Sequence, residues 1–202
     1  LLTGITDENS QRYATFAYDV NGKAVSTEHA GGVNRYSFNY SLYPNSITIT
    51  DPLGTQRTNT YQAIQGVARL KSSSQPCSSC GSSNFSTVNY DSNGNISSRI
   101  DFKGNRTNYV YDLSRNLETQ RTEGLTASGA TTAVSRVFNT AWHATWRLPT
   151  VIAEPLKRTT YAYGGGTGVT CGAVGKVCTK TEQATSDVNG SQGFNAVAVG
   201  SP

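Results

Sequence analysis

The chain has 202 residues, of which 36% are hydrophobic, 15% are charged and 9% are aromatic. So polar a chain cannot build a thick apolar core, yet it holds too many aromatic residues for a solvated, disordered tail. The net charge of +4 is mild and the basic residues are scattered singly, so we expect no nucleic-acid partner. No stretch approaches the roughly 18 apolar residues of a membrane span.

The first candidate repeat covers residues 5–29. It contains the phrase T-D-E-N-S-Q-R from Thr6 and the phrase Y-D-V-N-G-K from Tyr18. In the second phrase, Asn21 and Gly22 both tolerate positive φ, which predicts a type I′ hairpin turn after Tyr18 and Asp19.

A second weaker copy covers residues 47–70. Its first strand alternates apolar and polar residues, as S-I-T-I-T from Ser46. The turn that follows has Asp51 at its first position, a proline at its second and Gly54 at its last, which suits a β-turn. A Ser-rich stretch, residues 71–83, is predicted to be a loop-like insertion.

The clearest repeat unit covers residues 90–112. It joins Y-D-S-N-G-N to D-F-K-G-N-R-T and then to a strand in which two tyrosines share one face. Asn93-Gly94 predicts a second type I′ turn. The residues that define this unit are Tyr90, Asp91, Gly94, Asp101, Gly104, Tyr109, Tyr111 and Asp112. Because the same acidic residue recurs at the same turn, we interpret these aspartates as turn formers and expect no catalytic residue among them.

Residues 126–146 depart from the repeat and are predicted to be a second loop-like insertion. They contain Trp142 and Trp146, for which two interpretations stand. The rings can stack on a carbohydrate, or they can pack inside the protein with their N–H groups bonded to internal partners; we favour packing.

A further copy covers residues 146–163, and a Gly-rich loop covers residues 164–178. No window of the chain shows a convincing helical period, so we expect an all-β protein built of antiparallel hairpins.

The four cysteines form two close pairs, Cys77 with Cys80 and Cys171 with Cys178. Disulfides are the favoured interpretation, while free thiols and a zinc site remain as alternatives. Pairing within each close pair is the simplest connectivity, and a bond from Cys171 to Cys178 would clamp a hairpin. We expect no metal site and no cofactor.

These phrases resemble the RHS/YD repeat, whose pattern runs roughly Y-D-x-x-G-N/R-L and then D-x-x-G-x-x-T-x-Y. The resemblance covers about two-thirds of the chain and is most specific from Tyr90 to Asp112. It implies a β-ribbon, or part of a spiral β-shell, open at both ends here. The family's self-cleavage motif begins D-P-x-G, as at Asp51, but the leucine that should follow is absent. We therefore interpret this site as an ordinary turn.

The resemblance implies a structural role in a secreted or bacterial cell-surface protein, where the shell encapsulates or presents a toxin domain. The expected partners are the rest of its own parent chain, a toxin cargo and a secretion apparatus. The alternative is an adhesive module that binds carbohydrate; we expect no enzymatic activity. Because the chain has no methionine and ends without a clear capping repeat, we expect it to be an excerpt of a longer protein.

Overall fold

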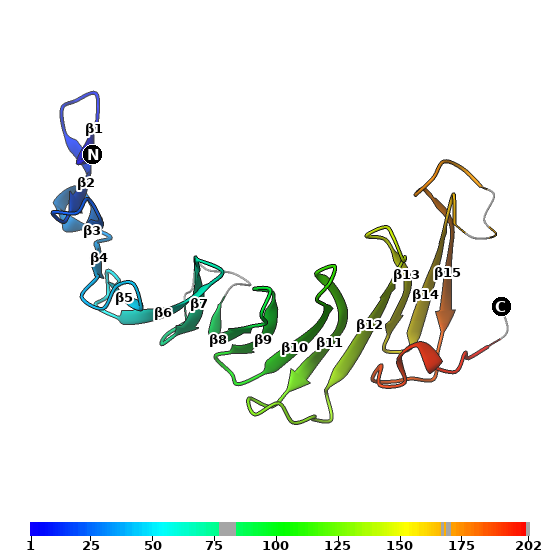
Figure 1. Cartoon of the computed structure of the whole chain (residues 1–202). Coiled ribbons are helices and arrows are strands. Elements are labelled where there is room, and N and C mark those ends of the chain that lie inside the picture. Colours follow the sequence, from blue (N-terminus) through cyan, green and yellow to red (C-terminus); the bar gives the residue numbers. More distant parts are fainter. Residues whose placement is uncertain (77–83, 167, 169–170, 201–202) are drawn as a thin grey trace. The chain divides into compact units, whose positions relative to one another are not determined.

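The computed structural model describes residues 1–76, 84–166, 168 and 171–200. Fifteen strands follow one another, and each is hydrogen-bonded to the strands before and after it in the chain (Figure 1). All the described pairings are antiparallel. The prediction of an all-β protein made of hairpins in an open sheet is therefore confirmed. The helical elements named in the described residues are two 3₁₀ turns, η1 (Ala30–Gly32) and η3 (Gly193–Asn195).

The chain divides into two compact units, 1–88 and 89–202. The strands of the first unit are β1 (Gly4–Thr6), β2 (Arg12–Tyr18), β3 (Ala24–His29), β4 (Tyr36–Asn39), β5 (Ser46–Thr50), β6 (Gln56–Ile64) and β7 (Val67–Ser73). Strand β8 (Phe85–Tyr90) contains the boundary. The strands of the second unit are β9 (Ile96–Asp101), β10 (Arg106–Asp112), β11 (Leu117–Leu125), β12 (Arg136–Trp142), β13 (Pro149–Glu154), β14 (Lys157–Tyr163) and β15 (Val177–Ala184).

One predicted insertion needs correction. Residues 126–146 contain β12, which pairs with β11 on one side and with β13 on the other. The alternation in R-V-F-N-T-A-W is that of a strand, but the expected Tyr-Asp phrase does not follow it. The extra loop is therefore confined to the residues between Leu125 and Arg136.

The two faces of the sheet differ in chemistry. In the second unit, Tyr109 lies opposite Arg121, which in turn lies opposite Phe138. On the other face, Asn108 lies opposite Ser98 and Thr122. The apolar residues that are fully buried in the described chain are few, as the composition predicts: Ala14, Val88, Leu117, Leu125, Ala153, Tyr163 and Ala196.

The turns are built around an aspartate that caps backbone amides. At Asp91, Oδ1 accepts hydrogen bonds from the N–H groups of Asn93 and Asn95, both at 2.9 Å. Gly94 takes φ +80° and donates its N–H to the Asp91 carbonyl. The same arrangement of a capping residue and a positive-φ residue three positions later recurs at Asp7, Asp19, Asp51 and Asp101, and with a threonine as the cap at Thr126.

The prediction of type I′ turns is wrong. Asn21 and Asn93 have no positive φ, and only the glycine after each takes that conformation. A type I turn followed by a left-handed residue fits these φ values and hydrogen bonds. The aspartate decides the outcome, because its carboxylate holds the amide of the asparagine and so orders the first part of the turn.

The connection between β14 and β15 carries a disulfide from Cys171 to Cys178, with a Cα–Cα distance of 5.8 Å. This confirms the predicted local pairing. Cys77 and Cys80 lie outside the described residues.

The Asp101 turn offers a direct test of capping. Replacing Asp101 with Ala removes the acceptor for the N–H groups of Lys103 and Asn105, so the free energy of unfolding should fall by about 1–2 kcal/mol. Urea unfolding measures the change. Replacing Gly104, which has φ +83°, with Ala should cost a similar amount through left-handed strain. A wild-type midpoint in both variants would contradict this account of the turn.

The same turn predicts a pH dependence. Burial raises the pKa of Asp101, but hydrogen bonds from the Asn105 side chain and from the N–H groups of Asn105 and Lys103 outweigh it and lower the pKa overall. A lowered carboxyl pKa contributes stability that is present above the unfolded value of about 3.9 and is lost as the pH falls through the folded value. The stability gap between the wild type and Asp101→Asn should therefore shrink below about pH 4.

Removing the disulfide should open one hairpin only. In a Cys171→Ser/Cys178→Ser variant we expect a loss of at most about 2 kcal/mol, because the closed loop is short. Tryptic cleavage after Lys176 should become faster, since the exposed loop loses its clamp. Cleavage after Arg121, which lies inside the sheet, provides the internal control and should not change. Equal cleavage after Lys176 in the variant and the oxidised wild type would show that the bond does not order this hairpin.

Candidate functional site

An aromatic residue stands at or near the end of each even-numbered strand. These residues are Tyr18, Tyr40, Tyr61, Tyr90, Tyr111, Trp142 and Tyr163. By subtraction of residue numbers, the intervals between them are 22, 21, 29, 21, 31 and 21 residues. The repeat therefore runs on a step of 21 or 22 residues. The interval from Tyr111 to Trp142 is longer because it contains the stretch 126–135 between β11 and β12. Tyr40 and Trp142 were missed as repeat positions because neither is followed by an aspartate.

A register shift accompanies these aromatic positions. On the side of the following strand, the pairing shifts immediately before Tyr18, Tyr61, Tyr111, Trp142 and Tyr163. At Tyr111 the extra residue is Thr119, whose hydroxyl donates back to the Val110 carbonyl at 3.1 Å. Such a bulge ends the regular ladder and re-aims the side chain next to it.

Several of these side chains donate a hydrogen bond to the preceding odd-numbered strand or to a residue within two positions of its start. The Tyr18 hydroxyl donates to the Leu2 carbonyl at 2.8 Å, and the Tyr163 hydroxyl donates to the Pro149 carbonyl at 2.7 Å. Burial raises the pKa of Tyr163, and the phenol remains the donor at neutral pH. Each bond joins the end of one strand to the start of its neighbour.

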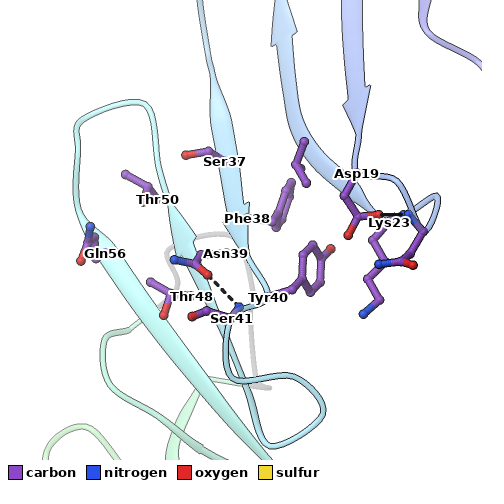
Figure 2. Close-up of a pocket in the computed structure, with 12 residues that line it drawn as sticks. Asp19, Lys23, Ser37, Phe38, Asn39, Tyr40, Ser41, Thr48, Thr50 and Gln56 are labelled. Carbon is purple, nitrogen blue, oxygen red and sulfur yellow. Dashed lines mark hydrogen bonds between the residues drawn. The ribbon is translucent and has the colours of Figure 1, made fainter.

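Tyr40 makes the same kind of bond, to the Ala24 carbonyl at 3.0 Å, and it lines an open groove in the first unit. The groove has a volume of about 740 Å³. In Figure 2, Asp19 and Lys23 lie on one side of the Phe38 and Tyr40 rings. Asn39, Thr48, Thr50 and Gln56 lie on the other side.

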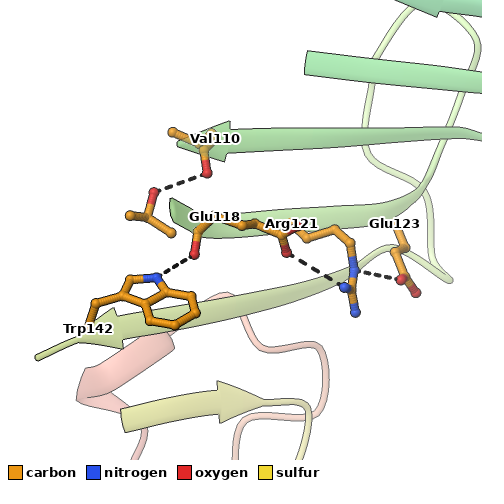
Figure 3. Close-up of polar contacts among 6 residues, drawn as sticks. Val110, Glu118, Arg121, Glu123 and Trp142 are labelled. Atoms are coloured by element: carbon orange, nitrogen blue, oxygen red, sulfur yellow. Dashed lines mark hydrogen bonds and ion pairs between the residues drawn. The ribbon is translucent and has the colours of Figure 1, made fainter. Parts of the chain in front are cut away.

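Trp142 occupies the tyrosine position of its own repeat. Its indole Nε1 donates to the Glu118 carbonyl at 2.7 Å, at the start of β11 (Figure 3). His143, which follows, occupies the aspartate position: its Nδ1 accepts hydrogen bonds from the N–H groups of Thr145 and Trp146, both at 3.2 Å. Trp142-His143 is thus the structural equivalent of Tyr-Asp.

Trp146 also has internal contacts. Its ring stacks on that of His143, with centroids 4.0 Å apart and planes at 9°. The guanidinium of Arg115 donates to the carbonyls of His143 and Trp146, both at 2.8 Å, and Arg147 donates back to the Arg115 carbonyl. The loop after β12 is thereby tied to the turn between β10 and β11.

Neighbouring turns also contact each other through asparagine side chains. Asn93 Nδ2 donates to the Leu113 carbonyl at 2.7 Å and to Asn116 Oδ1 at 2.9 Å, while Asn95 Nδ2 donates to Asn116 Oδ1 at 3.0 Å. The turn after β8 is therefore bonded to the turn after β10, one repeat later. Asn95 and Asn116 occupy the asparagine position of the repeat phrase Y-D-x-x-G-N, and together with Asn93 they join successive hairpins.

A charged cluster lies on β11 (Figure 3). Arg121 is 2.9 Å from Glu123 and 3.6 Å from Glu118, and Glu123 also pairs with Arg136 at 3.7 Å. Burial raises the pKa of Glu118, and the guanidinium groups of Arg121 and Arg99 reduce that rise. Arg121 and Arg99 therefore both lie close enough to Glu118 to stabilise its carboxylate.

The described residues contain no group of three or more His, Cys, Asp or Glu side chains placed to hold a metal ion. Within the same residues, no helix has the length and apolar character needed to cross a membrane.

The fold and these contacts define a class of protein: an open antiparallel sheet built of hairpin repeats, joined at the strand ends by aromatic and asparagine side chains. No family model matches the chain, and no curated protein matches it.

Among solved structures, the chain is similar to one in the crystal structure of TcdB2-TccC3 without its hypervariable C-terminal region. The identity is 11% and the TM-score 0.40, over 78% of this chain and 10% of that one. A chain of the *Photorhabdus luminescens* Tc holotoxin pore with the mutation TccC3-D651A gives 11% identity and a TM-score of 0.25, over 88% and 12%. A chain of TcdB2-TccC3-TEV gives the same values. This chain spans about a tenth of the length of the solved chains it matches.

The equivalence of Trp142-His143 with Tyr-Asp can be tested by exchange. The double variant Trp142→Tyr/His143→Asp should keep its free energy of unfolding within about 0.5 kcal/mol of the wild type, because both the cap and the donor persist. His143→Ala alone should lose about 1 kcal/mol, since two backbone N–H groups lose their acceptor. Unfolding in urea measures both, and an exchange variant as unstable as His143→Ala would refute the equivalence.

Proposed function

We propose that this chain is a structural segment of an RHS/YD-repeat protein, part of a β-shell that encapsulates or presents a toxin or effector domain. The observation that carries the proposal is the repeated unit itself. The units at Tyr18, Tyr90, Tyr111 and Trp142 combine an aromatic strand end with an aspartate or histidine cap. Asn93, Asn95 and Asn116 bond one unit to the next. Hairpins that are marginal alone become stable when stacked side by side, which suits a wall of extended length.

The chemistry of one face supports containment. Its polar side chains bond to each other across strands: Thr48 with Thr58 at 3.0 Å, Thr60 with Ser72, and Gln120 with Asn139 at 2.9 Å. Because these hydroxyl and amide groups bond to one another, few of them are free to hold a specific ligand. Such a wall would hold a cargo without a tight binding pocket.

The proposal includes an absence of catalysis. The turn aspartates use their carboxylates to cap backbone amides, as Asp91 and Asp101 do. A carboxylate held in this way serves the turn and has no free partner to activate. Trp142 and Trp146 are half-buried and engaged in contacts within the protein, which argues against a carbohydrate site at these rings.

The proposal places the protein outside the bacterial cytoplasm, either secreted or at the cell surface. The Cys171–Cys178 disulfide supports this, because such bonds persist in oxidising compartments. The proposed partners are the rest of the parent chain, its cargo and a secretion apparatus.

The parent gene provides the test. We expect its sequence beyond residue 202 to encode further repeats on the 21- or 22-residue step, followed by a terminal domain without repeats. In the purified parent protein, that terminal domain should resist a protease that cleaves it readily when it is produced alone. A parent without further repeats, or a terminal domain cleaved equally fast in both forms, would reject a containing shell.

A further inference from the structure

A hollow of about 570 Å³ lies on one face of the first unit, around Thr27 of β3. The strand register sets its walls, because Phe16 of β2 lies directly opposite Thr27 and Thr27 lies directly opposite Tyr36 of β4. Residues directly opposite each other in paired strands point to the same face of the sheet. Two aromatic rings therefore flank a small residue, and we call the space between them the Thr27 hollow.

The second unit contains a row of the same kind in which the central residue is an arginine. Tyr109 lies opposite Arg121, and Arg121 lies opposite Phe138. The guanidinium carbon of Arg121 is 4.6 Å from the centroid of the Phe138 ring, and its nitrogen atoms pair with Glu118 and Glu123. In this row a guanidinium occupies the space beside the rings.

The two rows occupy equivalent positions of the repeat. Both run from an even-numbered strand through an odd-numbered strand to the next even-numbered strand. By subtraction of residue numbers, the first ring lies two residues before an aromatic strand end, and the last ring lies four residues before the next one. The pairs are Phe16 with Tyr18, Tyr36 with Tyr40, Tyr109 with Tyr111, and Phe138 with Trp142. Only the central residue changes in kind, from arginine to threonine, so the Thr27 hollow is the space that a guanidinium fills in the second unit.

The walls of the Thr27 hollow suit a cation. None of the residues that line it is a lysine or an arginine. His29 lies on the same face as Thr27, and its ring is in edge contact with the Tyr13 ring, with centroids 5.2 Å apart. Glu28, at the rim, is directed to the opposite face by the alternation of the strand and pairs with Arg35 at 3.6 Å. The hollow therefore offers aromatic rings and an imidazole, and no arginine or lysine of the residues around it is placed between the rings.

The rings can be reached from solvent. Tyr36 is 39% exposed and Tyr13 is 56% exposed, while Phe16 and Thr27 are half-buried. Neighbouring strands are about 4.8 Å apart, so a group above Thr27 lies within the roughly 6 Å over which an aromatic ring attracts a cation, on both sides. The chain itself shows such an attraction in the first unit, where the Lys23 ammonium lies 3.7 Å from the centroid of the Tyr43 ring.

We propose that the Thr27 hollow binds the guanidinium of an arginine side chain that belongs to a segment of a partner protein. A guanidinium is planar and weakly hydrated, so it stacks on aromatic faces such as those of Phe16 and Tyr36. Its N–H groups can donate to an imidazole nitrogen of His29. A lysine ammonium is more strongly hydrated and does not stack, so it should bind more weakly. The occupied row at Arg121 favours an arginine over a neutral or apolar ligand.

Nuclear magnetic resonance titration of the 202-residue chain with short peptides tests the proposal. The probe is the peptide Gly-Ser-Arg-Ser-Gly with blocked ends, added to about 20 mM, because a few exposed cation–π contacts give a Kd on the order of 1–10 mM. It should produce saturable shifts of the ring signals of Phe16 and Tyr36. The twin peptide with citrulline in place of arginine has the same shape without the charge, and it should bind at least about tenfold more weakly.

Variants of β3 provide a matched pair. Thr27→Arg places a guanidinium between the rings, as at Arg121, and should weaken peptide binding at least about tenfold. Ser26→Arg adds the same charge one residue away, but its side chain lies on the opposite face with Ser37, so it should bind as the wild type does. The pair separates filling of the hollow from charge repulsion. Phe16→Leu keeps an apolar side chain without the ring and should weaken binding about threefold. Dispersed amide signals from β2 and β4 would show that each variant is folded.

Four results would overturn the proposal. The first is the absence of saturable shifts with the arginine peptide in the folded chain. The second is equal binding of the arginine and citrulline peptides, which would make the site an apolar one. The third is wild-type binding by Thr27→Arg, or equal weakening by Ser26→Arg. The fourth is tighter binding of tetramethylammonium than of the arginine peptide, which would indicate a site for a small quaternary ammonium ligand.

Discussion

The capping of backbone amides by a turn aspartate is the interaction on which the rest of this structure depends. The chain buries few apolar side chains, so hydrophobic burial contributes little to each hairpin. At Asp91, two backbone N–H groups donate to one carboxylate, and the left-handed Gly94 reverses the chain. When every turn is ordered locally, adjacent strands meet in a defined register, and the sheet needs only a thin layer of packing.

The aromatic residue at each even strand end adds the second constraint. At Tyr18, Tyr40, Trp142 and Tyr163, the hydroxyl or indole N–H donates to a carbonyl of the preceding hairpin strand or near its start. The requirement is for a large ring that carries a donor, and tryptophan meets it as well as tyrosine does. Histidine likewise replaces aspartate at His143. That position needs only an acceptor for the N–H groups of the second and third residues that follow, Thr145 and Trp146.

This explains what could be predicted from the sequence. The phrases at Tyr18, Tyr90 and Tyr111 use the commonest residues for both roles, and from them the fold class and the hairpins were predicted. The Cys171–Cys178 bond was predicted separately, from the close spacing of the two cysteines. The repeat at Trp142 was missed because Trp142 and His143 replace the expected tyrosine and aspartate and because extra loop residues break the spacing. The repeat at Tyr40 was missed because Ser41 stands where the aspartate is expected. The prediction of the turn type was wrong because Asn-Gly suits both a type I′ turn and a type I turn followed by a left-handed glycine. Only the capping carboxylate distinguishes the two. The Thr27 hollow could not be foreseen, since it depends on which side chains the register places opposite one another across three strands.

The connection between β11 and β12 shows that one margin of the sheet tolerates added length. The ten-residue stretch between β11 and β12 follows an odd-numbered strand, so it lies at the margin of the second unit opposite the aromatic strand ends. In the second unit, β11 and β12 still pair through Gln120 and Asn139 despite the loop of ten residues between them. Loop length costs little once the strands it joins are paired. That margin is therefore a place where foreign peptides could be grafted for display, with the scaffold beneath them left unaltered.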